Sequence, residues 1–179
     1  MEWLNHLFTS IFKIFPVIWV VEPDECGVRI TLGTRVKDTP PGWYVHWKLI
    51  QSMEKIKVVP QVIDLRGQSI TTKDGKSILI SGAVQYKVTN ARKALLSVYD
   101  YDNNLQNVVL GVLARYTAAH TYDECRATGE LEKEVLAGAR EAASGWGLRI
   151  MQCFVTDLCE SRCIRIVGND IVPLEGEPE

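Results

Sequence analysis

Three histidines and five cysteines are the side chains of this 179-residue chain best suited to catalysis or metal binding. A hydrolytic or transfer site needs a nucleophile, a base and a group that orients the base. The histidines are scattered: His6 lies in an apolar stretch, His46 among aromatic residues and His120 at a predicted helix end. The sequence contains no Gly-x-Ser-x-Gly, no His-Glu-x-x-His and no phosphate-binding glycine loop. It therefore predicts no catalytic residues.

The cysteines are spaced more like free thiols than like a disulfide or metal framework. An odd number in a chain of this size favours reduced thiols and a reducing compartment. The C-terminal trio has spacings of five and three residues with no histidine nearby, so structural zinc is disfavoured. We predict no metal and no cofactor. Cys26, the first of the five, follows a hydrophobic segment and is a possible acylation site, although plain burial is the favoured reading. The other four are Cys125, Cys153, Cys159 and Cys163.

The overall charge points away from nucleic acid as a partner. The net charge is -2, the pI is about 6.0, and no long basic run occurs. A general nucleic-acid binder would need a surplus of Lys and Arg on one face. With 46% hydrophobic residues, the chain is long enough for one well-buried domain and a short appendage.

The N-terminal segment from Leu4 to Val21 reads as a nearly all-apolar helix with a narrow polar stripe through Lys13 and Pro16. It is shorter than the ~20 apolar residues of an uninterrupted membrane span. It could span a thinned bilayer, dip into it with a kink at Pro16, or lie in the interface. A helix docked on the protein's own core is the competing interpretation. In the membrane interpretations, the residues of this segment that are expected to contact the bilayer are Phe8, Ile11, Phe12, Ile14, Phe15, Ile18 and Trp19.

An alternating strand and an aromatic turn follow this segment. From Glu25 to Gly33, Val28, Ile30 and Leu32 are expected on one face of a half-buried strand. Pro40-Pro41-Gly42 then forces a rigid turn, because two fixed φ angles precede a residue that tolerates positive φ. The turn leads into Trp43, Tyr44 and Trp47, a composition typical of a membrane-water boundary. Burial of the two tryptophans in the core is an equally supported alternative.

The remainder predicts an α+β domain. Strands are expected around Ile56, from Val62 to Ile70 and from Ile78 to Val88, with a hairpin turn at Asp74-Gly75. Helices are expected over 90–98, 102–120 and 130–144, with a capping box at 121–124, and a returning strand over 148–158. On the longest helix, Leu110 and Leu113 fall outside the expected buried stripe. They are the candidate residues for self-association.

The order of motifs resembles the SPFH superfamily, also called Band 7 or prohibitin-homology proteins, which includes stomatin, prohibitin and flotillin. The resemblance is collinear from about Val21 to Ile166. Its pieces include Glu25-Cys26-Gly27-Val28, Pro41-Gly42-Trp43-Tyr44-Val45, Val62-Ile63-Asp64-Leu65-Arg66, Thr72-Lys73-Asp74-Gly75, Val84-Gln85-Tyr86-Lys87-Val88, Leu113-Ala114-Arg115, Tyr122-Asp123-Glu124 and Trp146-Gly147-Leu148.

This resemblance implies a non-enzymatic membrane scaffold with an α+β domain lying on the bilayer. Its expected partners are membrane lipids, further copies of itself, and a membrane protease or channel. The expected organisation is a membrane-associating segment over 1–21, an SPFH domain over 22–166 facing a reducing, cytoplasmic compartment, and an acidic flexible tail over 167–179. The long coiled coil typical of the family does not follow the domain in this sequence. A monomeric lipid-binding or membrane-anchored adaptor module is the alternative function.

Overall fold

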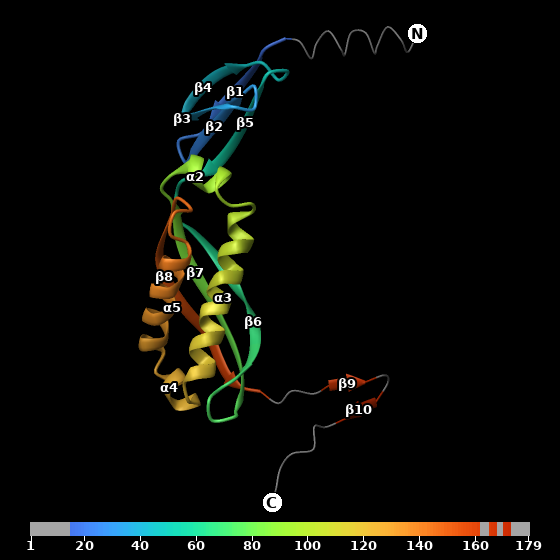
Figure 1. The fold of residues 1–179 in the computed structure, drawn as a ribbon, viewed down its shortest axis with the longest axis vertical. Helices are drawn as coiled ribbons and strands as arrows, with labels where there is room; N and C mark the ends of the chain where they lie inside the picture. The colour runs from blue at the N-terminus through green and yellow to red at the C-terminus, as the bar shows by residue number, and fades with distance from the viewer. Residues whose placement is uncertain (1–14, 162–164, 168–169, 173–179) are drawn as a thin grey trace, which may run out of the picture. The chain divides into compact units, whose positions relative to one another are not determined.

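The computed structural model describes residues 15–161, 165–167 and 170–172. The chain folds as two compact units, whose strands and helices are drawn in Figure 1. The first unit runs to Gln61 and includes Tyr86–Tyr101 and Ala143–Arg149, and the second contains the rest. The expected order, strands first, then helices, then a returning strand, is confirmed.

Five strands and one helix build the described part of the first unit. β2 (Glu25–Thr31) is the centre of an antiparallel sheet, with β3 (Arg35–Thr39) on one side and β5 (Gln51–Lys57) on the other. β1 (Val17–Val21) pairs antiparallel with β4 (Gly42–His46) in a separate two-stranded ribbon. The helix is α2 (Ala91–Leu96), which begins where the Asn90 side chain accepts a hydrogen bond from the Lys93 N–H, as the sequence predicts.

A three-stranded sheet with helices on one face builds the second unit (Figure 1). Its strand order is β6 (Gln61–Thr71), β7 (Ser77–Val88) and β8 (Leu148–Glu160). The covering helices are α3 (Tyr101–Ala119) and α5 (Thr128–Ala142), joined by the short α4 (Tyr122–Arg126). The predicted capping box of α4 is confirmed, with Thr121 and Glu124 bonded reciprocally. β9 (Arg165–Val167) and β10 (Asp170–Val172) form an antiparallel hairpin.

The core of the second unit lies between the inner face of β7 and the two long helices. Ile78, Ile80 and Val84 of β7 are fully buried, as the alternation predicts. α5 also satisfies backbone groups of the outer strand β8. Arg140 donates from Nε to the Ile150 carbonyl at 3.1 Å. Glu132 accepts from the Val155 N–H at 3.0 Å, so part of this sheet edge is blocked against pairing with another strand.

The predicted helix over Leu4–Val21 is wrong for its last five residues, which form β1. The run Val17-Ile18-Trp19-Val20-Val21 contains four β-branched residues, three valines and one isoleucine. Such a run favours a strand once Pro16 has interrupted a helix. Phe15 and Pro16 are not helical either, and residues 4–14 of the prediction lie outside the described residues. Two smaller expectations also differ: Leu32 has a positive φ of 51° and lies in an exposed turn, and β10 falls within the predicted tail.

Leu110 and Leu113 were expected outside the buried stripe of their helix, and this is wrong. Their side chains are only 5% and 2% exposed. The reason is that α3 is covered by α5 as well as by the sheet: Gly138 of α5 lies so close to α3 that an added Cβ would be 2.6 Å from Cγ1 of Val112. A helix covered on two sides buries a wider apolar band than one face. The surplus of apolar residues is therefore core.

Candidate functional site

One face of the β1–β4 ribbon consists of exposed apolar side chains. Directly opposed residues of an antiparallel pair share a face, and the register pairs Ile18 with Val45 and Val20 with Trp43. These four side chains are 67%, 48%, 53% and 73% exposed in that order. We call Ile18, Val20, Trp43 and Val45 the outer face. A contiguous exposed patch of this kind marks a contact surface for a membrane or a protein.

The opposite, inner face of the ribbon packs on the three-stranded sheet. Trp19 lies over Gly27 of β2, where an added Cβ would be 2.6 Å from the indole Cζ3. Lys55 of β5 holds its Nζ 5.3 Å from the centroid of the same ring and forms an ion pair with Glu25 at 2.9 Å. Gly27, which has no side chain, thus allows the ribbon to lie against the sheet. The outer face is left pointing away from it.

The turn before β4 holds the ribbon in this orientation. Gly42 has φ of 150°, which L side chains rarely adopt. The Tyr44 hydroxyl donates to the Pro40 carbonyl at 2.8 Å, and His46 is buried on the inner face, opposite Val17 in register. Nδ1 of His46 has no hydrogen-bond partner within the described part of the chain. These contacts fix which side of β4 faces inward.

Two turns at one end of the first unit add further exposed apolar side chains. The backbone N–H of Leu32 donates to the carbonyl of Ile50 at 2.8 Å, so the β2–β3 turn lies beside the β4–β5 loop. Leu32, Leu49 and Ile50 line a shallow hollow of about 290 Å³, together with Lys48. Leu32, Leu49 and Trp47 are exposed. Because β1 begins opposite the end of β4, the chain enters β1 at this same end.

The structure separates the predicted contact residues into three groups. Phe15, Ile18, Trp43 and Trp47 are exposed, so the core alternative for the two tryptophans is wrong. Trp19 and Tyr44 are only half-exposed, because the strand register turns both toward the sheet; a helical reading could not separate Trp19 from Ile18. Those outside the described residues are Phe8, Ile11, Phe12 and Ile14. Sequence reasoning missed Val20 and Val45, which period-2 readings of 17–21 and of 42–46 would have found.

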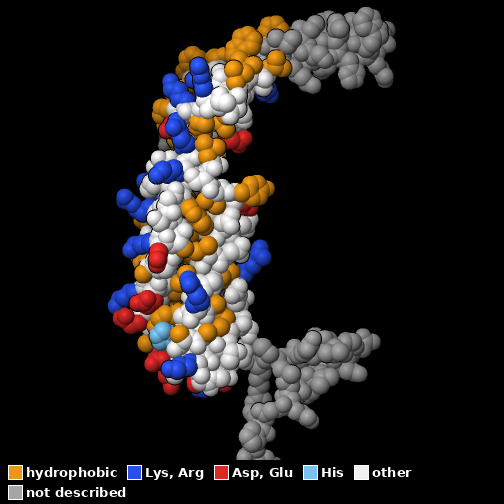
Figure 2. Space-filling view, in the orientation of Figure 1, with side chains coloured by type: hydrophobic (Ala, Val, Ile, Leu, Met, Phe, Trp, Pro, Cys, Tyr) orange, Lys and Arg blue, Asp and Glu red, His pale blue; other side chains and the backbone are white. Residues whose placement is uncertain are grey.

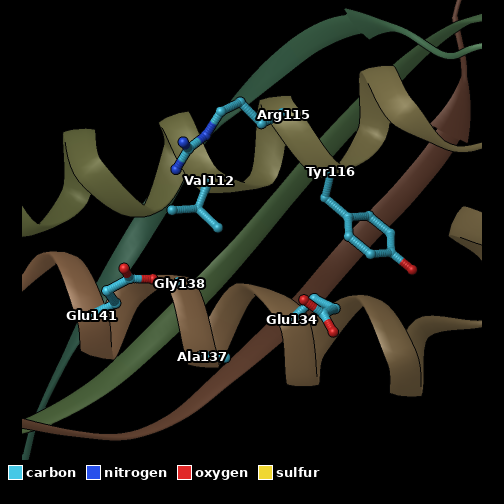
Figure 3. Close-up of a pocket in the computed structure, with 7 residues that line it drawn as sticks. All are labelled: Val112, Arg115, Tyr116, Glu134, Ala137, Gly138 and Glu141. Atoms are coloured by element: carbon cyan, nitrogen blue, oxygen red, sulfur yellow. The ribbon is translucent and has the colours of Figure 1, made fainter.

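A second hollow lies between α3 and α5 in the other unit (Figure 3). This groove, about 400 Å³ in volume, is lined by Arg115 and Tyr116 of α3 and by Glu134, Gly138 and Glu141 of α5, among others. The two carboxylates are seven residues apart, or about 10 Å along a helix. The lining residues include no serine, cysteine or histidine, so they do not supply a nucleophile and base pair. The groove resembles a helix-packing notch more than a reaction site.

The thiols within the described residues are free, namely Cys26, Cys125, Cys153 and Cys159. Burial raises the pKa of the Cys153 thiol to about 11 and also raises the pKa of Cys125. Burial, with a smaller contribution from Asp38, raises the pKa of Cys26. A raised pKa leaves less of the nucleophilic thiolate at neutral pH. Acylation of Cys26 stays a prediction, and this environment does not favour it.

The strand meander, the helical half and the returning strand define an α+β domain of the type that the motif order suggested. The chain belongs to the SPFH domain / Band 7 family, which matches residues 19–162. None of the helices in the described ranges is long and apolar enough to cross a bilayer.

Three relatives illustrate the match. Stomatin-4 of Caenorhabditis elegans is 23% identical over 192 residues, covering 99% of this chain and 68% of the relative. A putative band 7 family protein of Acanthamoeba polyphaga mimivirus is 26% identical, covering 82% and 46%. A stomatin homologue of Pyrococcus horikoshii is 23% identical, covering 86% and 60%. The chain thus spans roughly half to two thirds of the length of these relatives.

Proposed function

We propose that this protein is a non-enzymatic membrane scaffold whose first unit contacts the bilayer through the outer face of the β1–β4 ribbon. The observation that carries the proposal is the segregation of side chains on the ribbon, with Ile18, Val20, Trp43 and Val45 exposed while Trp19 packs on Gly27. The family commonly acts as a membrane scaffold and is generally non-enzymatic. Trp43 and Trp47 suit the headgroup depth, where an indole has an apolar body and a polar N–H.

The outer face is better suited to contact with a bilayer than to contact with a protein partner. The face is continuous in sequence with the apolar residues before Phe15, and the same end of the unit carries exposed Leu32 and Leu49. A surface that extends over a ribbon face and two turns fits a broad apolar layer. The N-terminal segment is proposed as a second contact, because eight of the fourteen residues before Phe15 are apolar and the cation Lys13 among them can reach the interface.

The test is flotation of the full chain with phosphatidylcholine vesicles. Replacing Ile18 and Trp43 by Gln should lower partitioning by about tenfold for each side chain, since each contributes roughly 1.5 kcal/mol of apolar transfer. Leu96→Gln with Val62→Gln removes two exposed apolar side chains elsewhere and is the matched control. Equal partitioning of the two double variants would refute the ribbon as a contact.

The contribution of the N-terminal segment is separable if the deletion respects β1. Removing residues 1–14 leaves Val17–Val21 paired with β4, whereas removing 1–21 deletes a strand of the domain. The protein lacking residues 1–14 should still bind vesicles, more weakly than the full chain. Complete loss of binding would assign all membrane contact to the segment.

Self-association on the membrane is the second part of the proposal and rests on the family relationship. Scaffolding of lipids or of a membrane protease or channel requires several copies side by side. Crosslinking of vesicle-bound protein over a range of surface densities should give multimers. A protein that stays monomeric at high density would instead favour the alternative, a monomeric lipid-binding or anchored adaptor module.

A further inference from the structure

The face of the three-stranded sheet that carries Gly27 is strongly basic. In the β2–β3 and β2–β5 registers, side chains of opposed residues share this face, and alternate residues of each strand return to it. Its charged members are five cations and one carboxylate: Arg29, Arg35, Lys37, Lys55, Lys57 and Glu25. Lys55 pairs with Glu25. The excess of positive charge therefore gathers toward the Thr31 end of the sheet.

Arg29 and Lys37 lie directly opposite each other there, and Arg35 is the next β3 residue on the same face. Like charges at opposed positions destabilise an antiparallel pair. Among the residues that the structure describes, no ion pair joins any of the three to a carboxylate, while Asp38 pairs with Arg92 on the other face. A cluster of this kind is relieved by an anion from outside the chain.

The cation cluster and the ribbon lie on the same side of the three-stranded sheet, and the outer face of the ribbon points away from the sheet on that side. The contact of Trp19 with Gly27 shows that the ribbon lies over this side, and Arg35 and Lys37 are exposed beside it. Figure 2 shows Lys and Arg side chains gathered next to the hydrophobic side chains over these strands. Long cationic side chains beside an apolar membrane-contact face reach the depth of lipid phosphates.

The two units also differ in charge. Among the described residues, the first unit carries ten Lys and Arg against six Asp and Glu, whereas the second carries eight against twelve. The overall charge of -2 therefore conceals a positive first unit. A negatively charged bilayer surface attracts the unit that bears the apolar contact face.

We propose that Arg29, Arg35 and Lys37 bind the phosphates of anionic phospholipids, so that the protein selects negatively charged membranes. This inference rests on the proposed function, since it assigns a lipid class to the same membrane-contact surface. The apolar outer face supplies binding to any bilayer. The cation cluster supplies the preference among bilayers.

The test compares binding of the full chain to phosphatidylcholine vesicles and to vesicles that also contain phosphatidylglycerol, at about 0.15 M ionic strength. The ratio of the two partition coefficients is the readout. Each cation near an anionic surface contributes about fivefold, so three give on the order of a hundredfold. The variant Arg29→Gln, Arg35→Gln, Lys37→Gln should lose most of this ratio while its binding to phosphatidylcholine is unchanged.

A matched control removes three positive charges from exposed positions of the second unit through Lys73→Gln, Arg115→Gln and Arg126→Gln. This control should keep the ratio, as should a variant with Arg29→Lys and Arg35→Lys, which retains the charges. The Gln triple variant should unfold at the same or a higher temperature than the wild type, because the opposed Arg29 and Lys37 charges are gone.

Four results would overturn the inference. A wild-type ratio near one, with binding to both vesicles, leaves the proposed function standing and removes lipid selection. An equal loss in the control shows dependence on net charge alone, and displacement by inorganic phosphate at matched concentration shows a site for the free anion. Failure to bind either vesicle would refute the membrane function together with the inference.

Discussion

Val20 of β1 and Trp43 of β4 lie directly opposite each other, and both side chains are exposed. Cross-strand apolar neighbours normally stabilise a sheet by packing against a core. In this ribbon the core lies on the other side, beneath Trp19 and Tyr44, so the Val20–Trp43 pair contributes little to burial in the isolated chain. Under the proposed function the pair gains its burial on contact with the bilayer, which is the physical basis of that proposal.

The packing of Trp19 on Gly27 makes position 27 intolerant of any side chain. Gly27→Ala places a Cβ about 2.6 Å from the indole ring and should lower the free energy of unfolding by roughly 1–3 kcal/mol. The cost should shrink in a Trp19→Leu background, measured by a double-mutant cycle in urea. An identical cost in both backgrounds would show that the ribbon does not rest on Gly27 through this ring.

The buried positions of Leu110 and Leu113 give a clear prediction for their substitution. Each Leu→Ala change should lower the free energy of unfolding by about 2–5 kcal/mol, because it leaves a cavity in the core. Asn107→Ala, at an exposed position of the same helix, is the control. Denaturant unfolding measures the effect. Stable leucine variants with a smaller assembly would restore these residues to an intermolecular interface.

The notch between α3 and α5 predicts a second glycine effect. Gly138→Ala should destabilise the protein by roughly 1–3 kcal/mol through contact with Val112, and Val112→Ala should relieve most of that cost. Gly111→Ala on α3 meets open space, so it should stabilise the helix by about 0.5–1 kcal/mol. Thermal unfolding of Gly138→Ala, Val112→Ala, the variant with both changes, and Gly111→Ala checks the sign of each stability change. A stabilising Gly138→Ala would place the helices farther apart.

Acid should weaken the turn between β6 and β7. The pKa of Asp74 is lowered, chiefly because the Thr72 hydroxyl donates to its carboxylate, with a further contribution from the Tyr122 N–H. A group with a lowered folded-state pKa stabilises the protein above the unfolded value of about 4, and this contribution is lost as pH falls through the folded pKa. Asp74→Asn should therefore be less stable than wild type at neutral pH and match it near pH 3.

Melting temperatures between pH 3 and pH 7 test this sign. Asp123→Asn removes an equal charge next to Tyr122 and is the control. A constant difference between Asp74→Asn and wild type across this range would mean that the hydrogen bonds of Asp74 act without its charge.

The sequence was sufficient where local periodicity and burial agree. The alternation of Ile78, Ile80 and Val84, the Asn90 cap and the Thr121 capping box all appear in the structure as predicted. It failed where tertiary context decides. Whether α3 is covered on one side or two depends on how closely Gly138 lets α5 approach. Whether an apolar run such as 17–21 forms a helix or a strand is decided by its pairing with β4.

The same limit applied to the candidate site. The aromatic cluster after Pro41 drew attention to the correct segment, but composition does not distinguish the two faces of a strand. Trp43 is exposed while Tyr44 turns inward, because pairing with β1 sets the register. Likewise Arg29 and Lys37 are eight residues apart in sequence and directly opposed only once the β2–β3 turn is known.

Fluorescence from a single tryptophan tests the membrane assignment of the outer face most directly. One variant keeps only Trp43, with Phe at positions 3, 19, 47 and 146, and a matched variant keeps only Trp19, with Phe at positions 3, 43, 47 and 146. Both are bound to vesicles of lipids brominated near the headgroup, which quench indoles at that depth. Trp43 should be strongly quenched and Trp19 only weakly. Equal quenching of the two, or none of Trp43 in vesicle-bound protein, would contradict the membrane assignment.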